Sequence, residues 1–127
     1  MSSPVLFHST NLVSDQVTFS QALLKGQAPD KGLYMPEYIP RIPLDEIHAF
    51  KGKPYYEIAF EIAAKFMTGE IPGDDLLAIA RDSYNYDVPL EQVHDRKYVM
   101  RLDRGPTASF KDFAARLMGR LMQYYLA

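Results

Sequence analysis

The sequence predicts an α/β protein in two parts. Residues 1–94 are expected to form an α+β domain that is mostly helical with short strands, and residues 95–127 to form the first strand–helix unit of a second, truncated domain. Two observations support this. A β-rich stretch precedes a Gly105-Pro106 turn and then a helix, which is how an α/β unit begins. Apolar residues also recur at three- and four-residue intervals, as on one face of a helix, over 54–69, 71–84 and 111–126.

The N-terminal segment contains a predicted strand followed by a predicted helix. Val5–His8 is rich in bulky apolar residues and ends at a polar turn, which is typical of a short strand. Thr18 and Gln21 have the spacing of a capping box, so a helix is expected to begin there. Gly26 is well placed to end this helix in a left-handed conformation.

A turn, a second strand and a stiff connector come next. In the turn Ala28–Gly32, proline presets one dihedral angle and Gly32 is expected to supply the positive one. Leu33–Met35 reads as a strand that Pro36 stops. Three prolines from Pro36 to Pro43 make an extended connector, and Pro43 can occupy the first turn of a short helix that runs to about Phe50.

Two longer helices follow. Pro54 opens the first, whose stripe of apolar side chains is expected to pack on a core, and Thr68-Gly69 closes it. The second begins near Ile71 and carries Asp74 and Asp75 where the helix dipole favours acids. These two carboxylates are therefore interpreted as caps, and not as a metal or acid–base pair.

The C-terminal part is predicted as loop, strand and helix. Pro89–Asp95 is polar and without periodicity, which favours a domain boundary. Tyr98–Leu102 is the expected strand. The apolar stripe of the final helix is expected to pack on a sheet that lies outside this chain, so its exposure would favour self-association of the isolated fragment. The stripe comprises Phe113, Leu117, Leu121 and Tyr125, with Ala114, Met118 and Met122 beside it.

Composition excludes several classes of protein. The formal net charge of −2 gives nucleic-acid binding no electrostatic support. The basic group Arg96, Lys97, Arg101 and Arg104 is more typical of a solvated strand face. No apolar run is long enough to span a membrane. The absence of cysteine and of a signal peptide favours a cytoplasmic address, and the three histidines are too scattered to form a local metal motif.

Lys111 is the candidate reactive group. Ser109 and Asp112 resemble a capping box, which places Lys111 at about the second helical position. A cation there loses about 0.3–1 kcal/mol to the helix dipole. Phe110 and Phe113 suggest an apolar setting that further disfavours the ammonium form. A neutral amine is what Schiff-base chemistry with a carbonyl requires. The alternative is that Lys111 extends into solvent or pairs with Asp112.

The run Gly105-Pro106-Thr107-Ala108-Ser109-Phe110-Lys111-Asp112-Phe113 resembles threonine synthase, a pyridoxal-phosphate enzyme family of the tryptophan-synthase-like fold. The family pattern reads Gly-Pro-Thr, two variable residues, then Phe-Lys-Asp. Three upstream segments also resemble the family's small N-terminal domain in the same order: Gln16–Leu23, Gly32–Pro36 and Glu70–Pro72. The resemblance covers essentially the whole chain, as the N-terminal portion of a longer enzyme.

The resemblance implies a lyase of threonine biosynthesis. It would convert O-phospho-L-homoserine and water to L-threonine and phosphate. Lys111 would carry pyridoxal 5'-phosphate covalently and then move protons, and Phe110 would pack close to the cofactor. The seven glycines never cluster into a phosphate-binding turn. The remaining cofactor-binding residues are therefore expected beyond Ala127, and the fragment alone is expected to be inactive or nearly so.

Two departures from the family pattern leave alternatives open. Arg104 stands where many relatives have histidine, so its contribution is open. Ser109 stands where alanine is frequent, and the resulting Ser-Phe-Lys-Asp run is closer to amino-acid dehydratases and lyases of the same fold. A third interpretation is a non-catalytic interaction domain in which Lys111 is structural.

Overall fold

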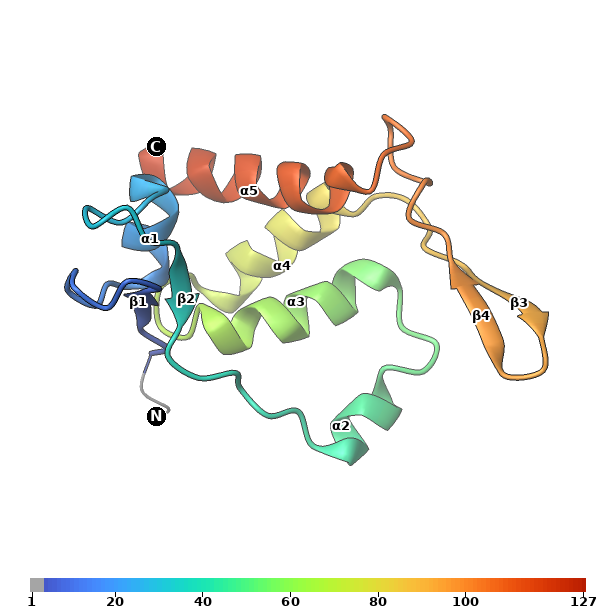
Figure 1. Ribbon diagram of the computed structural model, residues 1–127. Helices are drawn as coiled ribbons and strands as arrows, with labels where there is room; N and C mark the ends of the chain where they lie inside the picture. Colours follow the sequence, from blue (N-terminus) through green and yellow to red (C-terminus); the bar gives the residue numbers. More distant parts are fainter. Residues whose placement is uncertain (1–3) are drawn as a thin grey trace.

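The computed structural model describes residues 4–127 and shows a mixture of helices and short strands, as predicted. Helix α4 lies between α3 and α5 (Figure 1). A small ribbon of β1 and β2 lies with α1 at one end of these helices, and a hairpin of β3 and β4 projects from the other end. The elements are β1 (Phe7–Ser9), α1 (Phe19–Lys25), β2 (Tyr34–Pro36), α2 (Leu44–Ala49), α3 (Tyr55–Phe66), α4 (Gly73–Ser83), β3 (Leu90–His94), β4 (Lys97–Met100) and α5 (Lys111–Leu126).

Strands β1 and β2 pair in antiparallel fashion, with Phe7 opposite Pro36. Pro36 was expected to stop the second strand, yet it is that strand's last residue. The reason is that Phe7 exchanges both of its backbone hydrogen bonds with Val17 on its other side, at 2.8 and 2.9 Å. Position 36 therefore needs no N–H group, and proline is tolerated there.

The predicted capping box of α1 is confirmed. The Thr18 hydroxyl accepts from the Gln21 backbone N–H at 3.4 Å, and the Gln21 side chain accepts from the Thr18 N–H at 3.1 Å. Gly26 caps the other end with φ 71° and ψ −75°. Its φ is positive as predicted, but its ψ lies outside the left-handed helical region.

A second N-terminal cap of α1 comes from a distant part of the chain. The Glu70 carboxylate, in the loop between α3 and α4, accepts from the backbone N–H groups of Phe19 and Ser20 at 2.9 and 3.0 Å. Helix α1 has no acidic residue in its own first turn. Glu70 therefore supplies the negative charge that this helix end favours.

The turn at residues 28–32 differs from the prediction in which residue takes the positive φ. Lys31 adopts φ 67°, not Gly32. Gly32 is required for space instead, since a Cβ atom there would lie 2.0 Å from the Ser9 hydroxyl oxygen. Ser9 is fully buried and donates to the Asp30 carboxylate at 2.6 Å, which ties β1 to this turn.

Helices α2 and α3 begin directly after prolines. Pro43 and Pro54 both occupy the N-cap position, so Pro43 precedes the first turn that it was expected to enter. The apolar stripe of α3 was expected to pack on a core, and this is confirmed in part. Phe66 and Ala63 pack against buried clusters and Met67, just after the helix, is 5% exposed, whereas Ile62 is 39% exposed.

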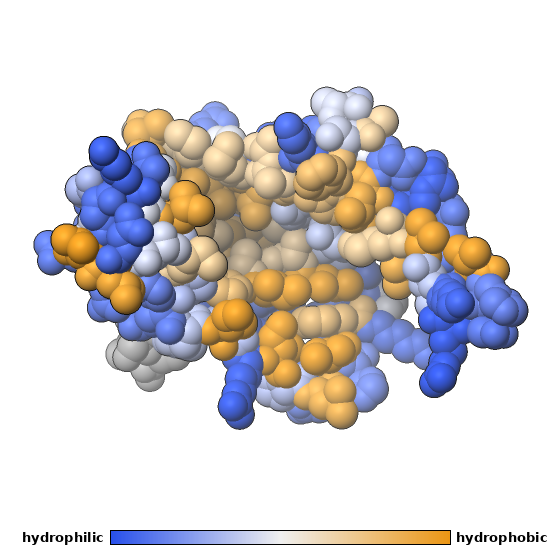
Figure 2. Space-filling view, in the orientation of Figure 1, coloured by the Kyte–Doolittle hydropathy of each residue, from blue (hydrophilic) through white to orange (hydrophobic). Residues whose placement is uncertain are grey.

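Most of this stripe also lines an open hollow of about 370 Å³. Figure 2 shows apolar side chains gathered on this face, where the surface is hollowed between α5 and α3. The hollow is lined by Phe7, Phe19, Pro36, Tyr55, Ala59, Ile62, Ala63, Phe66, Met67, Tyr84 and Leu117.

The main core lies where α4 meets α5. Leu76 and Leu121 are 1% and 2% exposed and pack with Met67 and Ile71. The apolar stripe of α5 therefore packs within this chain, and the expectation that it is exposed here is wrong. The sequence could not reveal this because the partners of Leu121 lie about 45 to 55 positions upstream.

The acids at the start of α4 act differently from the prediction. Asp74 and Asp75 lie in its first turn, but the N-cap residue is Pro72 and no side chain caps the helix by a hydrogen bond. Asp75 instead accepts from the Tyr124 hydroxyl at 3.2 Å. The two carboxylates can favour the helix only through its dipole.

The expected loop at 89–95 is wrong, because β3 occupies most of it. Strand β3 pairs antiparallel with β4, and both strands expose every residue. Strand β4 ends two residues earlier than predicted, and its partner within residues 4–127 is β3, not a strand of a parallel α/β unit. The predicted domain division at 94/95 falls in the turn of this hairpin and stays a prediction.

Candidate functional site

Lys111 is the first residue of α5. The N-cap residue is Phe110, with φ −59° and ψ −19°, and it makes no side-chain cap. The predicted capping box is therefore wrong: Ser109 lies one residue too early, and its hydroxyl accepts only from the Lys111 backbone N–H, at 3.3 Å. Lys111 still lies in the first turn, where the helix dipole opposes a cation.

The expected apolar setting of Lys111 is not present. The Lys111 side chain is exposed, and Phe110 is 66% exposed. Phe113 points away into an aromatic cluster with Tyr55, at 5.5 Å between ring centroids. Within residues 4–127 the Lys111 amine makes no hydrogen bond or ion pair, so the pairing with Asp112 considered above does not form either.

Asp112 is instead bound to the loop that precedes the helix. It is 5% exposed. One carboxylate oxygen accepts from the Thr107 backbone N–H at 2.9 Å, and the other accepts from the Thr107 hydroxyl at 2.8 Å. A Cβ atom at Gly105 would lie 2.4 Å from this carboxylate. The Gly105–Thr107 loop and the first turn of α5 are thus one packed unit.

The same loop contains a residue in the left-handed region. Ala108 has φ 55°, which costs a non-glycine residue roughly 1–2 kcal/mol. Its N–H donates to the Gly105 carbonyl at 3.0 Å. Such a conformation persists where surrounding contacts enforce it, and the Thr107–Asp112 hydrogen bonds do so here.

Two side chains fix α5 against α4. The Arg116 guanidinium donates to the backbone carbonyls of Ser83 and Asp82 at 2.7 and 2.9 Å, at the C-terminus of α4. The Tyr84 hydroxyl donates to the Phe113 carbonyl at 2.8 Å. Burial raises the pKa of Tyr84 to about 12, with smaller effects from neighbouring tyrosines. These contacts between α4 and α5 therefore fix the position of the Lys111 backbone.

The basic cluster on the hairpin is a solvated face. Arg101 pairs with Glu91 at 2.8 Å and with Asp103 at 2.6 Å. The hydrogen bond from Arg101 lowers the pKa of Asp103 to about 2. Arg104 is exposed beside these groups. These internal pairs fit the sequence interpretation of this cluster.

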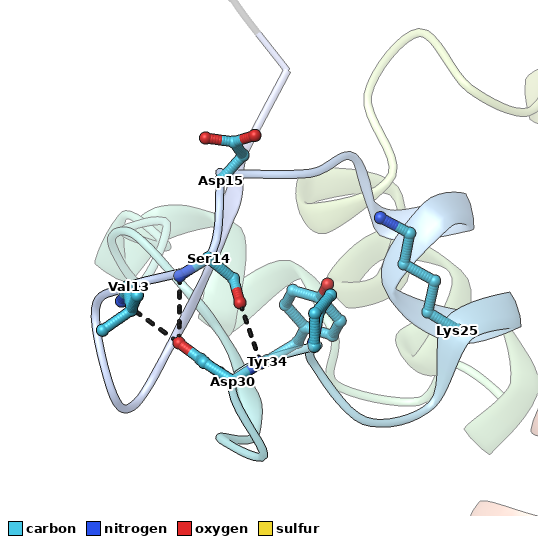
Figure 3. A pocket seen from close by; sticks show the side chains of 7 residues that line it. Val13, Ser14, Asp15, Lys25, Asp30 and Tyr34 are labelled. Atoms are coloured by element: carbon cyan, nitrogen blue, oxygen red, sulfur yellow. Dashed lines mark hydrogen bonds between the residues drawn. The ribbon is translucent and has the colours of Figure 1, made fainter.

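A second pocket, of about 420 Å³, lies beside the turn at Asp30 (Figure 3). The Asp30 carboxylate accepts from Ser9, from the backbone N–H groups of Val13 and Ser14, and from Gly32. These hydrogen bonds, that of Ser9 foremost, hold the pKa of Asp30 well below its usual range. These hydrogen bonds join β1, the loop after it and the turn at Asp30, so we assign the carboxylate a structural role.

Within residues 4–127, no group of three or more His, Cys, Asp or Glu side chains is arranged to hold a metal ion. None of the helices in this part of the chain combines the length and the apolar character needed to cross a membrane.

Sequence reasoning identified Lys111 but missed the residues that support it. The Thr107–Asp112 interaction, five residues apart, has a signal in the sequence: a Gly-Pro-Thr turn before a helix that carries an acid in its first turn. Arg116 has no such signal, since its partners lie 33 and 34 positions away.

Comparison with known proteins gives a consistent result. The family model described as threonine synthase N terminus matches residues 6–84. Threonine synthase of Pseudomonas aeruginosa is 40% identical over 94% of this chain, which covers 26% of that protein. Threonine synthase of Schizosaccharomyces pombe is 37% identical over 99% of the chain, again 26% of its own length. The chain thus spans about a quarter of the length of these curated relatives.

Solved structures agree with the sequence matches. A PLP-bound threonine synthase from Brucella melitensis superposes with a TM-score of 0.91 at 38% identity, over 96% of this chain and 27% of that one. Threonine synthase from Escherichia coli gives a TM-score of 0.88 at 26% identity, over 95% of this chain and 28% of that one.

Proposed function

This chain belongs to the threonine synthase family, and from that premise we propose that it is the N-terminal part of a pyridoxal-phosphate-dependent threonine synthase. The whole protein would convert O-phospho-L-homoserine and water to L-threonine and phosphate. In this proposal residues 1–94 form the N-terminal domain and residues 95–127 begin the catalytic domain. A cytoplasmic location belongs to the same proposal and is checked by fractionating cells that make the whole protein.

The observation that carries the proposal is the exposed amine of Lys111 at the start of α5. An amine without a hydrogen bond or ion pair within residues 4–127 fits covalent attachment of an aldehyde cofactor. The exposed ring of Phe110 is available to pack against it. When bound, pyridoxal phosphate supplies an electron sink for negative charge on the substrate.

The role of Lys111 follows from its place in the helix. Lys111 lies in the first turn of α5 with its side chain exposed. In this proposal its Nζ atom would accept a proton from the substrate and return it to a later position, as a general base and acid. The side chain's four-carbon stem allows the nitrogen to reach more than one substrate atom.

Cofactor trapping in the whole protein tests this proposal. Borohydride reduction in the presence of pyridoxal phosphate is expected to label the peptide that contains Lys111. The Lys111→Ala variant should lose both the label and the visible absorbance band. Lys97→Ala, which removes an exposed lysine on the hairpin, should keep both. A whole protein that never takes up the cofactor would favour the non-catalytic interaction domain and refute the proposal.

A dehydratase or lyase of the same fold is the second candidate, favoured by the run Ser109-Phe110-Lys111-Asp112, which is closer to those enzymes. Assays of phosphate release from O-phosphohomoserine and of ammonia release from threonine or serine separate the two. Ammonia release without phosphate release would select this candidate.

Self-association of the isolated chain also stays a prediction. The stripe of α5 no longer supports it, since that stripe is packed. Its remaining basis is the exposed apolar side chains of the hairpin, Leu90, Val93, Tyr98, Val99 and Met100. A clean monomer in light scattering would contradict it.

A further inference from the structure

The hydrogen bonds between Thr107 and Asp112 indicate that Asp112 has a role other than stabilising the helix. A carboxylate that is 5% exposed is costly unless it is hydrogen-bonded. Both oxygens of Asp112 are satisfied by a single residue, Thr107, through its N–H and its hydroxyl. Neither bond satisfies the α5 backbone, so the carboxylate serves the loop and not the helix end.

The loop needs this support. Ala108 holds a left-handed conformation between Thr107 and Ser109, and Gly105 leaves no room for a side chain against the Asp112 carboxylate. Without the two hydrogen bonds, the strain at Ala108 would favour relaxation of the loop. The base of the Lys111 side chain would then lose its fixed direction, because its backbone N–H is bound to Ser109 in the same loop.

We propose that Asp112 and Thr107 form a clamp that positions the Lys111 amine for covalent attachment of its aldehyde cofactor. This inference rests on the proposed function. Asp112 and Thr107 are positioning residues, since they act through the loop and the first turn of α5. Lys111 has a long flexible stem, so fixing its backbone restricts the volume that Nζ explores and raises the fraction of productive encounters.

The test uses the whole protein freed of cofactor, with pyridoxal phosphate as the probe and borohydride trapping at Lys111 as the readout. Thr107→Val removes the hydroxyl donor and keeps the side-chain shape at an exposed position. It is expected to slow labelling between about 10-fold and 100-fold. Thr107→Ser restores the hydroxyl and should label at nearly the wild-type rate. Asp112→Asn weakens the same clamp from the other side and should also slow labelling.

A control and a stability measurement separate positioning from simple destabilisation. Asp74→Asn removes an exposed carboxylate from the first turn of α4 and should leave labelling unchanged. Unfolding free energies of all variants are measured in parallel, and labelling is compared only where each protein is more than nine-tenths folded. Thr107→Val that folds and labels as fast as wild type overturns the clamp. A wild-type protein without any label at Lys111 overturns the proposed function, and the clamp with it.

Discussion

The requirement for glycine at position 105 of the Gly-Pro-Thr motif has a direct steric reason. Its backbone lies against the Asp112 side chain, and an added Cβ would be 2.4 Å from one carboxylate oxygen and 2.9 Å from the carboxylate carbon. These atoms belong to a buried side chain whose position two hydrogen bonds fix, so they have little freedom to move aside. The requirement is for space, since Gly105 has no positive φ.

We therefore expect Gly105→Ala to lower the unfolding free energy by about 1–3 kcal/mol, as overpacking of a buried site does. Gly119→Ala is the matched control, because Gly119 lies in the middle of α5 with nothing within 4 Å of its added Cβ. It should raise stability by roughly 0.5–1 kcal/mol, since alanine favours a helix interior. Urea denaturation measures both, and equal effects of the two changes would contradict the steric explanation.

Asp30 is the residue whose ionisation contributes most clearly to folding. Its pKa lies below the ordinary value of 3.8, so the folded state favours the carboxylate. The resulting stabilisation is fully present above the ordinary value and is lost as the pH falls toward the lowered pKa. We expect Asp30→Asn to be less stable than wild type at pH 7, and the difference to shrink as the pH falls below about 4.

Unfolding free energies at a series of pH values check this behaviour. Asp15→Asn is the control, because Asp15 lines the same pocket and makes no hydrogen bond within residues 4–127. It should change stability at pH 7 by no more than about 0.5 kcal/mol. A difference between wild type and Asp30→Asn that grows on acidification would show that the sign is wrong.

At the scale of elements, short sequence patterns correctly predicted those features that contacts between neighbouring residues determine. The capping box of α1 was correct because Thr18 and Gln21 satisfy each other within one turn. Strand β3 was missed because both faces of the hairpin are exposed, which leaves no alternation of apolar and polar residues to detect. The cap of α5 was misplaced because Asp112 binds Thr107 and leaves Ser109 without its expected partner.

The cap that Glu70 provides could not be predicted from a short sequence pattern, because Glu70 lies about 50 positions away from the start of α1. We expect Glu70→Ala to cost about 1.5–3 kcal/mol, the usual range for hydrogen bonds to a charged group, and to lower hydrogen-exchange protection in α1. Glu61→Ala is the control, because Glu61 makes only a partly exposed pair with Lys53 at 3.4 Å. Its loss should cost less than about 1 kcal/mol. Unchanged exchange in α1 of the Glu70 variant would refute the cap.

At the scale of the whole molecule, α5 and its lysine are held by contacts that join three helices. Phe19 packs both on a buried cluster of Val5, Phe7, Val17 and Ala22 and on the main core around Leu76 and Leu121. It therefore links the β1–β2 ribbon to the main core. Tyr55 at the start of α3, Tyr84 at the end of α4 and Phe113 in α5 meet in one aromatic cluster. The sequence could predict each helix from its own period, but not this meeting point, because its members are separated by about 30 residues.

Tyr84 connects this cluster to α5 by its hydrogen bond to the Phe113 carbonyl, and it makes the whole molecule sensitive to alkaline pH. Its pKa is raised from 10.0 to about 12, so the folded state favours the protonated phenol. The stabilisation is fully present below pH 10 and is lost as the pH rises through the raised pKa. Tyr84→Phe is expected to cost about 1 kcal/mol at pH 7 and to weaken the loss of stability above pH 10.

Tyr98→Phe is the matched control, because Tyr98 is 57% exposed on the hairpin. It should leave stability nearly unchanged. The absorbance of the phenolate gives a second measurement: the Tyr84 phenol dominates the difference between the wild-type and Tyr84→Phe titrations. A midpoint of that difference near 12 would confirm that the helices enclose the Tyr84 hydroxyl together. A midpoint near 10 would mean that α3, α4 and α5 do not close around it in solution, and the anchoring of Lys111 through α4 would then be wrong.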